Sequence, residues 1–495
     1  MLNLLLMICR IINLQIRSKY TGRDRVRLML TIAGPGGRYC DGLSRRSFLK
    51  IGGLELGGLS LASILKAEAA SKLRSSKKAV IMVLLPGGPP HLDMYDLKPK
   101  APAEIRGEFK PIATRVPGID ICELMPRLAA NMDKFVPIRS LVGGLEDHNL
   151  HQCLTGWETH PRQGDSRDIP GYPEGGWPSI GAVMSKLMGP IDPSIPPYLS
   201  LAPPKAESTT RASLNQSGYL GSAFAGYEPL KMSTSDTVLK GITLDRMANR
   251  KALLQSIDQF RRQSDISREV SAFDGYTSQA FDMLTSSRVS QALDLSLEDP
   301  KVRAKYGIPN EVEAVKGGGK HLESFLIARR LVDAGVRCVT LAFSQWPLER
   351  ESLGGNNWDW HTGNFRKARI TLPMLDMGIT ALVDDLTASG RIDDVSIVVW
   401  GEFGRSPRIN GDAGRDHWPR VGGALMAGGG IRAGQVLGAT NAMGESAIER
   451  PIHYRDVFAT LYHNLGIDAA NTMLHDRSDR PHNLIDNRKP IHELV

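Results

Sequence analysis

One stretch of the chain gathers residues that could bind an anion or a metal ion. The apolar run VSIVVW at 395–400 predicts a buried strand of a parallel sheet, and a Gly-rich polar segment follows it directly. This segment places six ionisable side chains within sixteen residues: Glu402, Arg405, Arg408, Arg415, Asp416 and His417. Ligands of open α/β sheets bind at the carboxyl ends of strands, so these groups suit an anionic substrate, a metal ion, or both. The alternative is a polar surface loop whose Arg and Asp side chains pair with each other.

Two further polar segments also follow predicted strands. The run AVIMVLL ends in the turn PGGPP, after which come His91, Asp93 and Asp96. By themselves, the two aspartates are more typical of a capped turn or short helix than of a ligand site. The segment WDWH places Asp359 and His361 two residues apart, so both side chains share one face of an extended backbone.

A histidine-rich segment, EDHNLHQCLTGWETH at 146–160, adds His148 and His151 beside Asp147. Imidazoles with carboxylates nearby are typical ligands of zinc and of other transition metals. The other explanation is that these are solvated loop histidines.

Strand and helix patterns alternate along the chain from residue 77. Strands are predicted at 79–85, at the end of 123–142, and at 196–201, 337–343 and 395–400, and 422–434 is predicted as a strand with its glycine turn. Helices are predicted at the start of 123–142 and at 177–189, 321–335, 372–390 and 452–467. A polar stretch and then a helical pattern predict an insertion or cap at about 203–320. The order predicts an α/β fold with a doubly wound, mainly parallel sheet and helices on both faces. In such a fold the polar segments after the strands meet at one edge of the sheet.

Composition excludes several functional classes. Residues 1–78 contain 15 Lys and Arg against 4 Asp and Glu, a balance of +11, so the rest of the chain contributes −3 to the net charge of +8. The basic charge therefore belongs to the first part of the chain, and the remainder has no signature of nucleic-acid binding. Beyond the first part, the cysteines Cys122, Cys153 and Cys338 have no metal-ligand spacing and form no disulfide scaffold. No run there is apolar enough to span a bilayer.

The first part of the chain has the features of an export signal. SRRSFLKIGG at 44–53 is followed by a weakly apolar stretch and by AEAAS, which resembles a twin-arginine signal at 44–70. Met29 is then the expected start, and residues 1–43 are an extension that the native protein is expected to lack in part. The expected location is periplasmic or at the cell surface.

Several motifs together resemble a known family. In order, they are SRRSFLKIGG, VLLPGGPPHLDMYDLKP, the LTG after the histidine-rich segment, WDWHTGNF, GEFGRSPRINGDAGRDHW and IHYRDVFATLYHNLGI. The chain after residue 40 resembles the exported proteins of domain-of-unknown-function family 1501, which are abundant in planctomycete-like bacteria. The resemblance implies an alkaline-phosphatase-like core over 77–495, as in sulfatases and phosphodiesterases, but it implies no particular reaction.

This sequence differs from the wider superfamily at several motif positions. Sulfatase-like enzymes end one strand in S-D-H-G, whose Asp and His hold a metal; here the similar place reads GEFG, with Glu402 acidic and Phe403 in place of the histidine. His417 is then a candidate either for the missing nitrogen or for a later histidine of the superfamily. In sulfatases the Cys or Ser nucleophile lies at a set distance before the LTG motif. At the same distance before LTGW, this chain has Glu146.

Two functions follow from this resemblance and these residues. The first is a metal-dependent hydrolase of small-molecule or polysaccharide sulfate or phosphate esters, using water as the nucleophile and a divalent ion such as Zn, Ca, Mn or Mg. Its predicted metal ligands are Asp93, Asp359, His361, Glu402, Asp416 and His417. Its predicted catalytic residues are His148 and His151 for proton transfer, and Arg405 and Arg415 for holding the anion. The second is a non-catalytic binding protein for an anionic polysaccharide or a cell-surface partner.

Overall fold

The structure is a computed structural model that describes residues 73, 76–158, 172–202, 216–229, 288–308, 319–344 and 357–495. The predicted extension at 1–43 and signal at 44–70 lie outside the described residues. So does most of the insertion predicted at 203–320. Its described parts include two short helices, α11 (Arg288–Leu293) and α12 (Pro300–Lys305).

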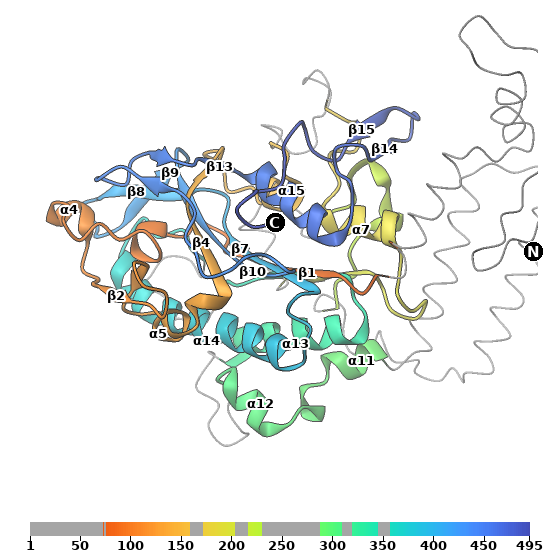
Figure 1. Cartoon of the computed structure of the whole chain (residues 1–495), viewed down its shortest axis with the longest axis horizontal. Helices are drawn as coiled ribbons and strands as arrows, with labels where there is room; N and C mark the ends of the chain where they lie inside the picture. The colour runs from red at the N-terminus through yellow and green to blue at the C-terminus, as the bar shows by residue number, and fades with distance from the viewer. Residues whose placement is uncertain are drawn as a thin grey trace, which may run out of the picture. The chain divides into compact units, whose positions relative to one another are not determined.

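A seven-stranded sheet forms the centre of the described unit, in the order β13-β4-β10-β7-β1-β6-β5 (Figure 1). Its strands are β1 (Ala79–Leu84), β4 (Phe135–Val142), β5 (Tyr198–Leu201), β6 (Cys338–Ala342), β7 (Val395–Trp400), β10 (Gly422–Gly428) and β13 (Ile452–His453). Only β10 runs against its neighbours, pairing antiparallel with β4 and β7. The mainly parallel α/β fold predicted from the sequence is confirmed.

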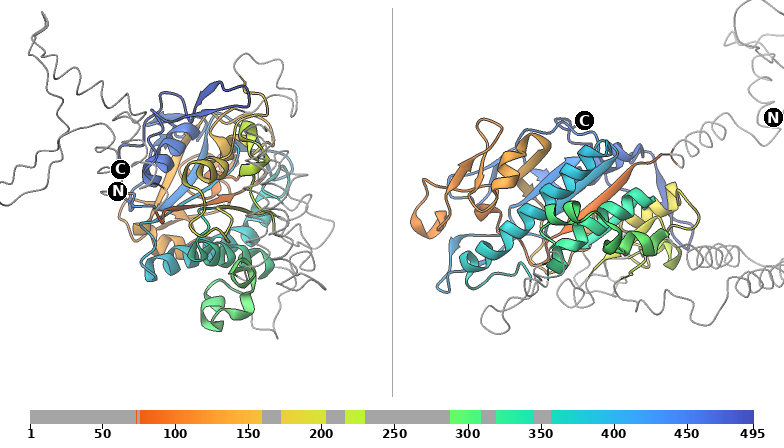
Figure 2. Two further views of the ribbon diagram at one scale, coloured as in Figure 1. Left: turned by 90° about the vertical axis from the view of Figure 1, so that its right-hand side faces the viewer. Right: turned by 90° about the horizontal axis from the view of Figure 1, so that it is seen from below.

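The strands are apolar on both faces because helices cover both sides of the sheet. Every residue of β1 is buried, and its side chains alternate between two hydrophobic cores. Ile81 and Val83 face the core that contains α5 (Pro126–Ala130), α13 (Gly319–Ala334) and α14 (Asn364–Ala388). Val80 and Met82 face the core that contains α7 (Ile180–Met188) and α15 (Tyr454–Leu465). The left-hand view in Figure 2 shows strands between these two helical layers.

Helix α14 begins eight residues before the predicted 372–390, at Asn364. The predicted helix begins at Leu372, directly before Pro373, and proline is tolerated in the first turn of a helix but unfavourable in its interior. The structure carries the helix through Pro373, since the apolar face continues through Phe365, Ala368, Leu372 and Leu375. The earlier start brings the first turn of α14 next to the segment that carries Asp359.

Small elements complete the unit, and one of them matters for the site. The segment after β7, predicted as a loop, folds into a hairpin of β8 (Gly404–Ile409) and β9 (Arg415–Trp418). The others are α4 (Ala103–Arg106), α6 (His151–Thr155), β2 (Pro111–Ala113), β3 (Asp120–Cys122), β11 (Ala439–Thr440), β12 (Ala447–Glu449), β14 (Met473–His475) and β15 (Pro481–Asn483). Each helix in the described part of the chain is too short or too polar to cross a membrane.

Candidate metal centre

The carboxyl ends of four strands bring a cluster of imidazoles and carboxylates together. His148 follows β4, Glu402 follows β7, and His417 lies on β9 of the hairpin after it. Asp359 and His361 come from the connection between β6 and α14. The turn after β1 contributes the backbone of Gly87, whose N–H donates to Glu402 at 2.8 Å. This is the edge at which open α/β sheets bind ligands.

Asp359 lies at the middle of the cluster, with three imidazoles turned towards it. Nε2 of His148 lies 3.3 Å from Oδ2, Nε2 of His361 lies 3.1 Å from Oδ1, and Nε2 of His417 lies 3.3 Å from Oδ1. The Nε2 atoms of His361 and His417 are 3.0 Å apart. Ligand atoms of His148, Asp359 and His417 all lie within 4.8 Å of one another, which allows a single ion to contact all three.

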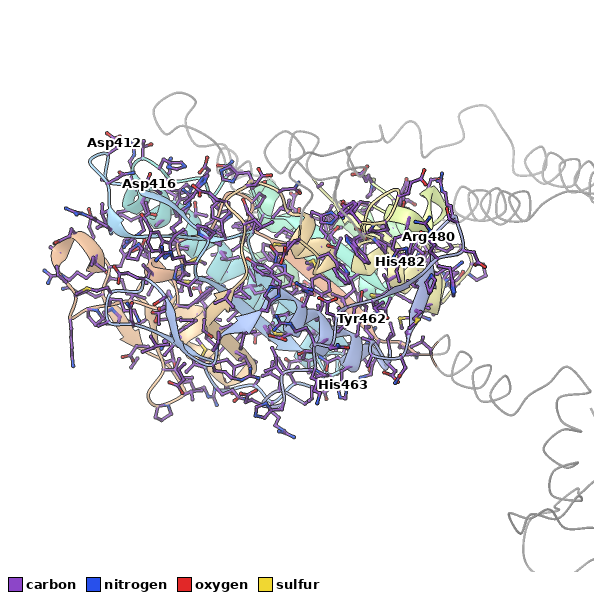
Figure 3. The ribbon with its side chains drawn as sticks, turned by 90° about the horizontal axis from the view of Figure 1, so that it is seen from above. Asp412, Asp416, Tyr462, His463, Arg480 and His482 are labelled. Carbon is purple, nitrogen blue, oxygen red and sulfur yellow. The ribbon has the colours of Figure 1, made fainter. Side chains whose placement is uncertain are left out.

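Glu402 and Asp416, both predicted as metal ligands, contact the outer nitrogens of two of these rings. Oε1 of Glu402 accepts from Nδ1 of His148 at 2.9 Å, and Oδ1 of Asp416 accepts from Nδ1 of His361 at 2.8 Å. Each bond leaves the Nε2 atom of its ring turned inward. Glu402 is buried, whereas the Asp416 side chain is 56% exposed. In Figure 3, Asp416 lies at the end of the unit opposite Arg480 and His482.

Arg405, predicted to hold an anionic substrate, is fully buried and donates to protein oxygens. Its Nη2 lies 2.5 Å from Oδ1 of Asp359 and also donates to the carbonyl of Gly87. Its Nε and Nη1 atoms donate to the carbonyls of Gly88 and Arg415 at 2.8 and 2.9 Å. Arg405 therefore ties Asp359 to the turn after β1 and to the hairpin.

Asp93 and Arg415 form a buried ion pair with each other. Nε and Nη2 of Arg415 donate to the two oxygens of Asp93 at 2.7 and 2.9 Å, and Asn364 donates to Asp93 at 2.8 Å. The other donors of Arg415 reach the carbonyls of Ser406, Pro407 and Ile105. The structure therefore gives both side chains protein partners, and their predicted roles in metal and anion binding remain predictions.

His151, predicted to transfer protons, is buried in α6, where its Nδ1 lies 3.0 Å from the amide of Gln216. Burial lowers its pKa to about 4, against the effect of the Gln216 hydrogen bond. His91 is also buried, and neither of its ring nitrogens has a hydrogen-bond partner among the described residues. Among the described residues, no hydrogen bond or ion pair joins either histidine to Asp359 or to the rings around it.

When no ion is bound, the electrostatics of the cluster favour a protonated His148 beside an ionised Asp359. Burial alone would lower the pKa of His148, but hydrogen bonds to Asp359 and Glu402 and their negative charge raise it to about 9. Burial likewise opposes ionisation of Asp359, yet hydrogen bonds from two histidines and Arg405 hold its pKa well below the usual range. The carboxylate is thus anionic at every working pH.

Sequence reasoning missed two contributors to the site. Phe403, noted only as the replacement of a histidine, packs its ring 4.6 Å from His417 and 5.2 Å from His148, between ring centroids. Lys367 lies buried on α14, and its charge acts on Asp359. Its place three residues after Asn364, on the face of α14 that is buried, was hidden because the helix was predicted to begin later.

The donor set fits a divalent metal ion. Zinc lies about 2.1 Å from nitrogen donors, so neighbouring donors in a tetrahedral site lie about 3.4 Å apart. The two separations of 3.3 Å between imidazole nitrogens and Asp359 oxygens match that spacing. Metal-bound histidines also typically donate their second nitrogen to a carboxylate, as His148 and His361 do here.

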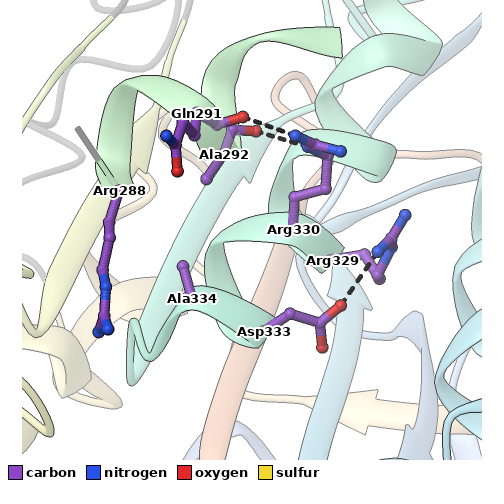
Figure 4. A pocket seen from close by; sticks show the side chains of 7 residues that line it. All are labelled: Arg288, Gln291, Ala292, Arg329, Arg330, Asp333 and Ala334. Carbon is purple, nitrogen blue, oxygen red and sulfur yellow. Dashed lines mark hydrogen bonds and ion pairs between the residues drawn. The ribbon is translucent and has the colours of Figure 1, made fainter. Parts of the chain in front are cut away.

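A hollow of about 480 Å³ lies elsewhere, between α11 and the last turns of α13 (Figure 4). These turns precede β6, so the hollow belongs to the amino edge of the sheet. Arg330 donates to the carbonyls of Gln291 and Ala292, and Arg329 pairs with Asp333 at 3.0 Å. Glu298 accepts from both arginines. The contacts of Arg329 and Arg330 therefore give these side chains a structural role, which is to connect α13 to α11 and to the segment that follows it.

Comparison with known proteins identifies the family and similar folds. A family model described as "Protein of unknown function (DUF1501)" matches residues 77–495. No curated protein has a sequence that matches this chain.

Solved structures with a similar arrangement have low sequence identity and low structural overlap. They include the sulfatase PsFucS1 from Pseudoalteromonas sp., with 11% identity and a TM-score of 0.34, covering 82% of this chain and 72% of that one. The phosphonate monoester hydrolase SpPMH from Silicibacter pomeroyi has 12% identity and a TM-score of 0.33, covering 79% and 73%. The lipoteichoic acid synthase LtaP from Listeria monocytogenes has 10% identity and a TM-score of 0.33, covering 80% and 73%.

Proposed function

Because this chain belongs to the family of proteins of unknown function DUF1501, we propose its function from its own site: a metal-dependent hydrolase of sulfate or phosphate esters. His148, Asp359 and His417 hold one divalent ion. When bound, the ion supplies a Lewis acid that polarises an ester oxygen. Water is the proposed nucleophile, because no serine, threonine or cysteine is among the described residues of the cluster.

One observation supports this proposal above the others. The Nε2 atoms of three histidines face one carboxylate, while carboxylates hold the outer nitrogens of two of these rings. A solvated loop or a set of surface ion pairs has no reason to fix both nitrogens of a ring in this way. The arrangement is that of metal ligands with oriented rings.

The chain's own residues have separable tasks in this proposal. Arg405 holds Asp359 in place from the buried side, so the carboxylate keeps one orientation. Phe403 packs against His148 and His417 and excludes water from that flank. His361 is the most solvent-exposed of the three histidines, so an ester reaches the centre from its side.

A panel of chromogenic sulfate and phosphate mono- and diesters, assayed with Zn²⁺, Mn²⁺ or Ca²⁺, tests the activity. Asp359→Ala and His417→Ala should each lower kcat/KM by at least about 100-fold, because each removes a ligand of the polarising ion. His463→Ala, on the exposed side of α15, is the matched control and should retain activity. If neither ligand variant alters a measured hydrolysis rate, the proposed centre does not carry the reaction.

The location of this activity is a separate proposal. The segment SRRSFLKIGG favours export by the twin-arginine route, which would place the ester substrate outside the cytoplasm. Replacing Arg45 and Arg46 by Lys should retain the full-length protein in the cytoplasm, as measured by cell fractionation. Unchanged export would contradict the proposal.

A further inference from the structure

The cluster offers an ion more nitrogen than oxygen. Two carboxylates beside it are turned away from the centre, because Glu402 and Asp416 accept from the outer nitrogens of His148 and His361. A third carboxylate, Asp93, binds Arg415 with both oxygens. Asp359 is therefore the carboxylate that faces the inward nitrogens.

Ligand chemistry separates the ions that suit such a centre. Ca²⁺ takes about six to eight oxygen ligands, and Mg²⁺ prefers carboxylate and water oxygens. Neutral imidazole suits Zn²⁺ and its first-row neighbours, and sites with two histidines and one carboxylate leave a position open for substrate. A centre of His148, His417 and Asp359 belongs to the second group.

We propose that this centre takes one first-row transition-metal ion of the Zn²⁺ type in preference to Ca²⁺ or Mg²⁺, and that Glu402 is the positioning residue that makes it selective. The inference rests on the proposed metal-dependent function, because it concerns the same site. It extends that function by assigning the class of ion and by giving Glu402 a role outside the ligand set.

Glu402 is placed to fix one ring orientation. It is 2% exposed, and its Oε1 accepts from both the Gly87 N–H at 2.8 Å and Nδ1 of His148 at 2.9 Å. Because Oε1 can only accept, Nδ1 of His148 keeps its proton, and Nε2, on the side of Asp359, is the ring nitrogen that would give up its proton to bind an ion. Its Oε2 is buried with no hydrogen-bond partner in the described part of the chain, so no second donor there draws the carboxylate away from the ring.

The pair of Asp416 and His361 provides an internal comparison. The contact distance is similar, at 2.8 Å, but both side chains are exposed, at 56% and 42%. Asp416 also accepts from Asn410 at 3.0 Å, so its charge is shared. Water can replace a partner at this position, and the effect of removing the carboxylate there should be smaller.

Metal affinity of the metal-stripped full chain tests the proposal directly. Titrations with Zn²⁺, Co²⁺, Mn²⁺, Ca²⁺ and Mg²⁺ give the affinities, and the visible absorption of Co²⁺ reports nitrogen coordination independently of activity. We expect one Zn²⁺ or Co²⁺ per chain and no displacement by a 100-fold excess of Ca²⁺. Glu402→Gln should weaken Zn²⁺ binding by about 10–100-fold, and Asp416→Asn by less. Glu449→Gln, on an exposed position of β12, should have no effect.

The outcomes separate this inference from the proposed function. If Ca²⁺ or Mg²⁺ binds as tightly as Zn²⁺ while esters are hydrolysed, the ion class is wrong and the hydrolase proposal stands. If Zn²⁺ binds selectively and no ester is hydrolysed, the assigned ion class stands and the hydrolase proposal is wrong. An unchanged Zn²⁺ affinity in a folded Glu402→Gln variant overturns the role of Glu402. Restoration of the affinity by Glu402→Asp would support that role, since a general packing defect would not be rescued by the shorter acid.

Discussion

The ion pair of Asp93 and Arg415 shows what a buried charge requires at the level of single residues. Both side chains are about 1% exposed or less, and every donor group of Arg415 has a protein acceptor. Burying either charge alone costs several kcal/mol, so each depends on the other. The pair also fixes β9 to the segment after β1, which places His417 two residues further along the chain.

Replacing Asp93 by Asn should therefore destabilise the protein without emptying the metal centre. The amide cannot balance the Arg415 charge, so we expect a loss of about 3 kcal/mol in the free energy of unfolding. Urea denaturation and metal analysis of the folded variant measure the two effects. Asp120→Asn, at an exposed position, is the control. A folded variant that has lost its metal would instead support Asp93 as a ligand, as the sequence predicted.

The sequence identified the reactive residues better than it identified their partners. His148, Asp359, His361 and His417 could be selected by type and by position after strands. Their division into inward and outward groups depends on contacts between residues 254 positions apart for His148 and Glu402, and 322 apart for Asp93 and Arg415. No local pattern encodes such contacts, so each carboxylate looked equally suitable as a ligand.

At the level of elements, strands were predicted well because a strand buried on both faces is a continuous apolar run. The runs at 79–85 and 395–400 gave β1 and β7 almost to the residue. The β8–β9 hairpin was missed because its residues are polar and its strands carry Arg405, Arg415 and His417. Interactions with Asp93, Asp359 and backbone carbonyls stabilise this hairpin, so its strands lack an apolar pattern.

The glycine turn after β1 packs closely against the segment that carries Asp359. Gly87 has a φ of +115°, and a Cβ there would lie 2.3 Å from the backbone nitrogen of Asp359. Gly87→Ala should push the Asp359 segment away and disturb the N–H bond to Glu402, lowering Zn²⁺ affinity at least about 10-fold. Gly118 has a φ of +84° with no atom within 4 Å, so Gly118→Ala should cost only about 1 kcal/mol of stability. Equal metal affinities in the two variants would show that the turn does not position Asp359.

For the whole molecule, the layered fold buries histidines in an uncharged form. Burial lowers the pKa of His91, His151 and His453 to about 4 each. In the unfolded chain a histidine titrates near a pKa of about 6.5. Between these values the unfolded chain binds protons that the folded protein does not, so stability must fall as the pH decreases from about 6.5 to 4. Asp376 has the opposite effect on stability. Burial raises its pKa to about 6, so below that pH the folded protein binds a proton there that the unfolded chain does not.

The net difference of about two protons predicts that the free energy of unfolding falls by about 3 kcal/mol per pH unit between pH 6 and 5. Urea denaturation at several pH values measures this slope. His91→Leu should reduce the slope by about 1.4 kcal/mol per pH unit, because it removes one of the three titrating rings. It should not lower stability at pH 7 through lost hydrogen bonds, since neither ring nitrogen of His91 has a partner among the described residues. His463→Gln, at an exposed position, should leave the slope unchanged. An identical slope in the His91→Leu variant would mean that His91 already titrates normally in the folded protein.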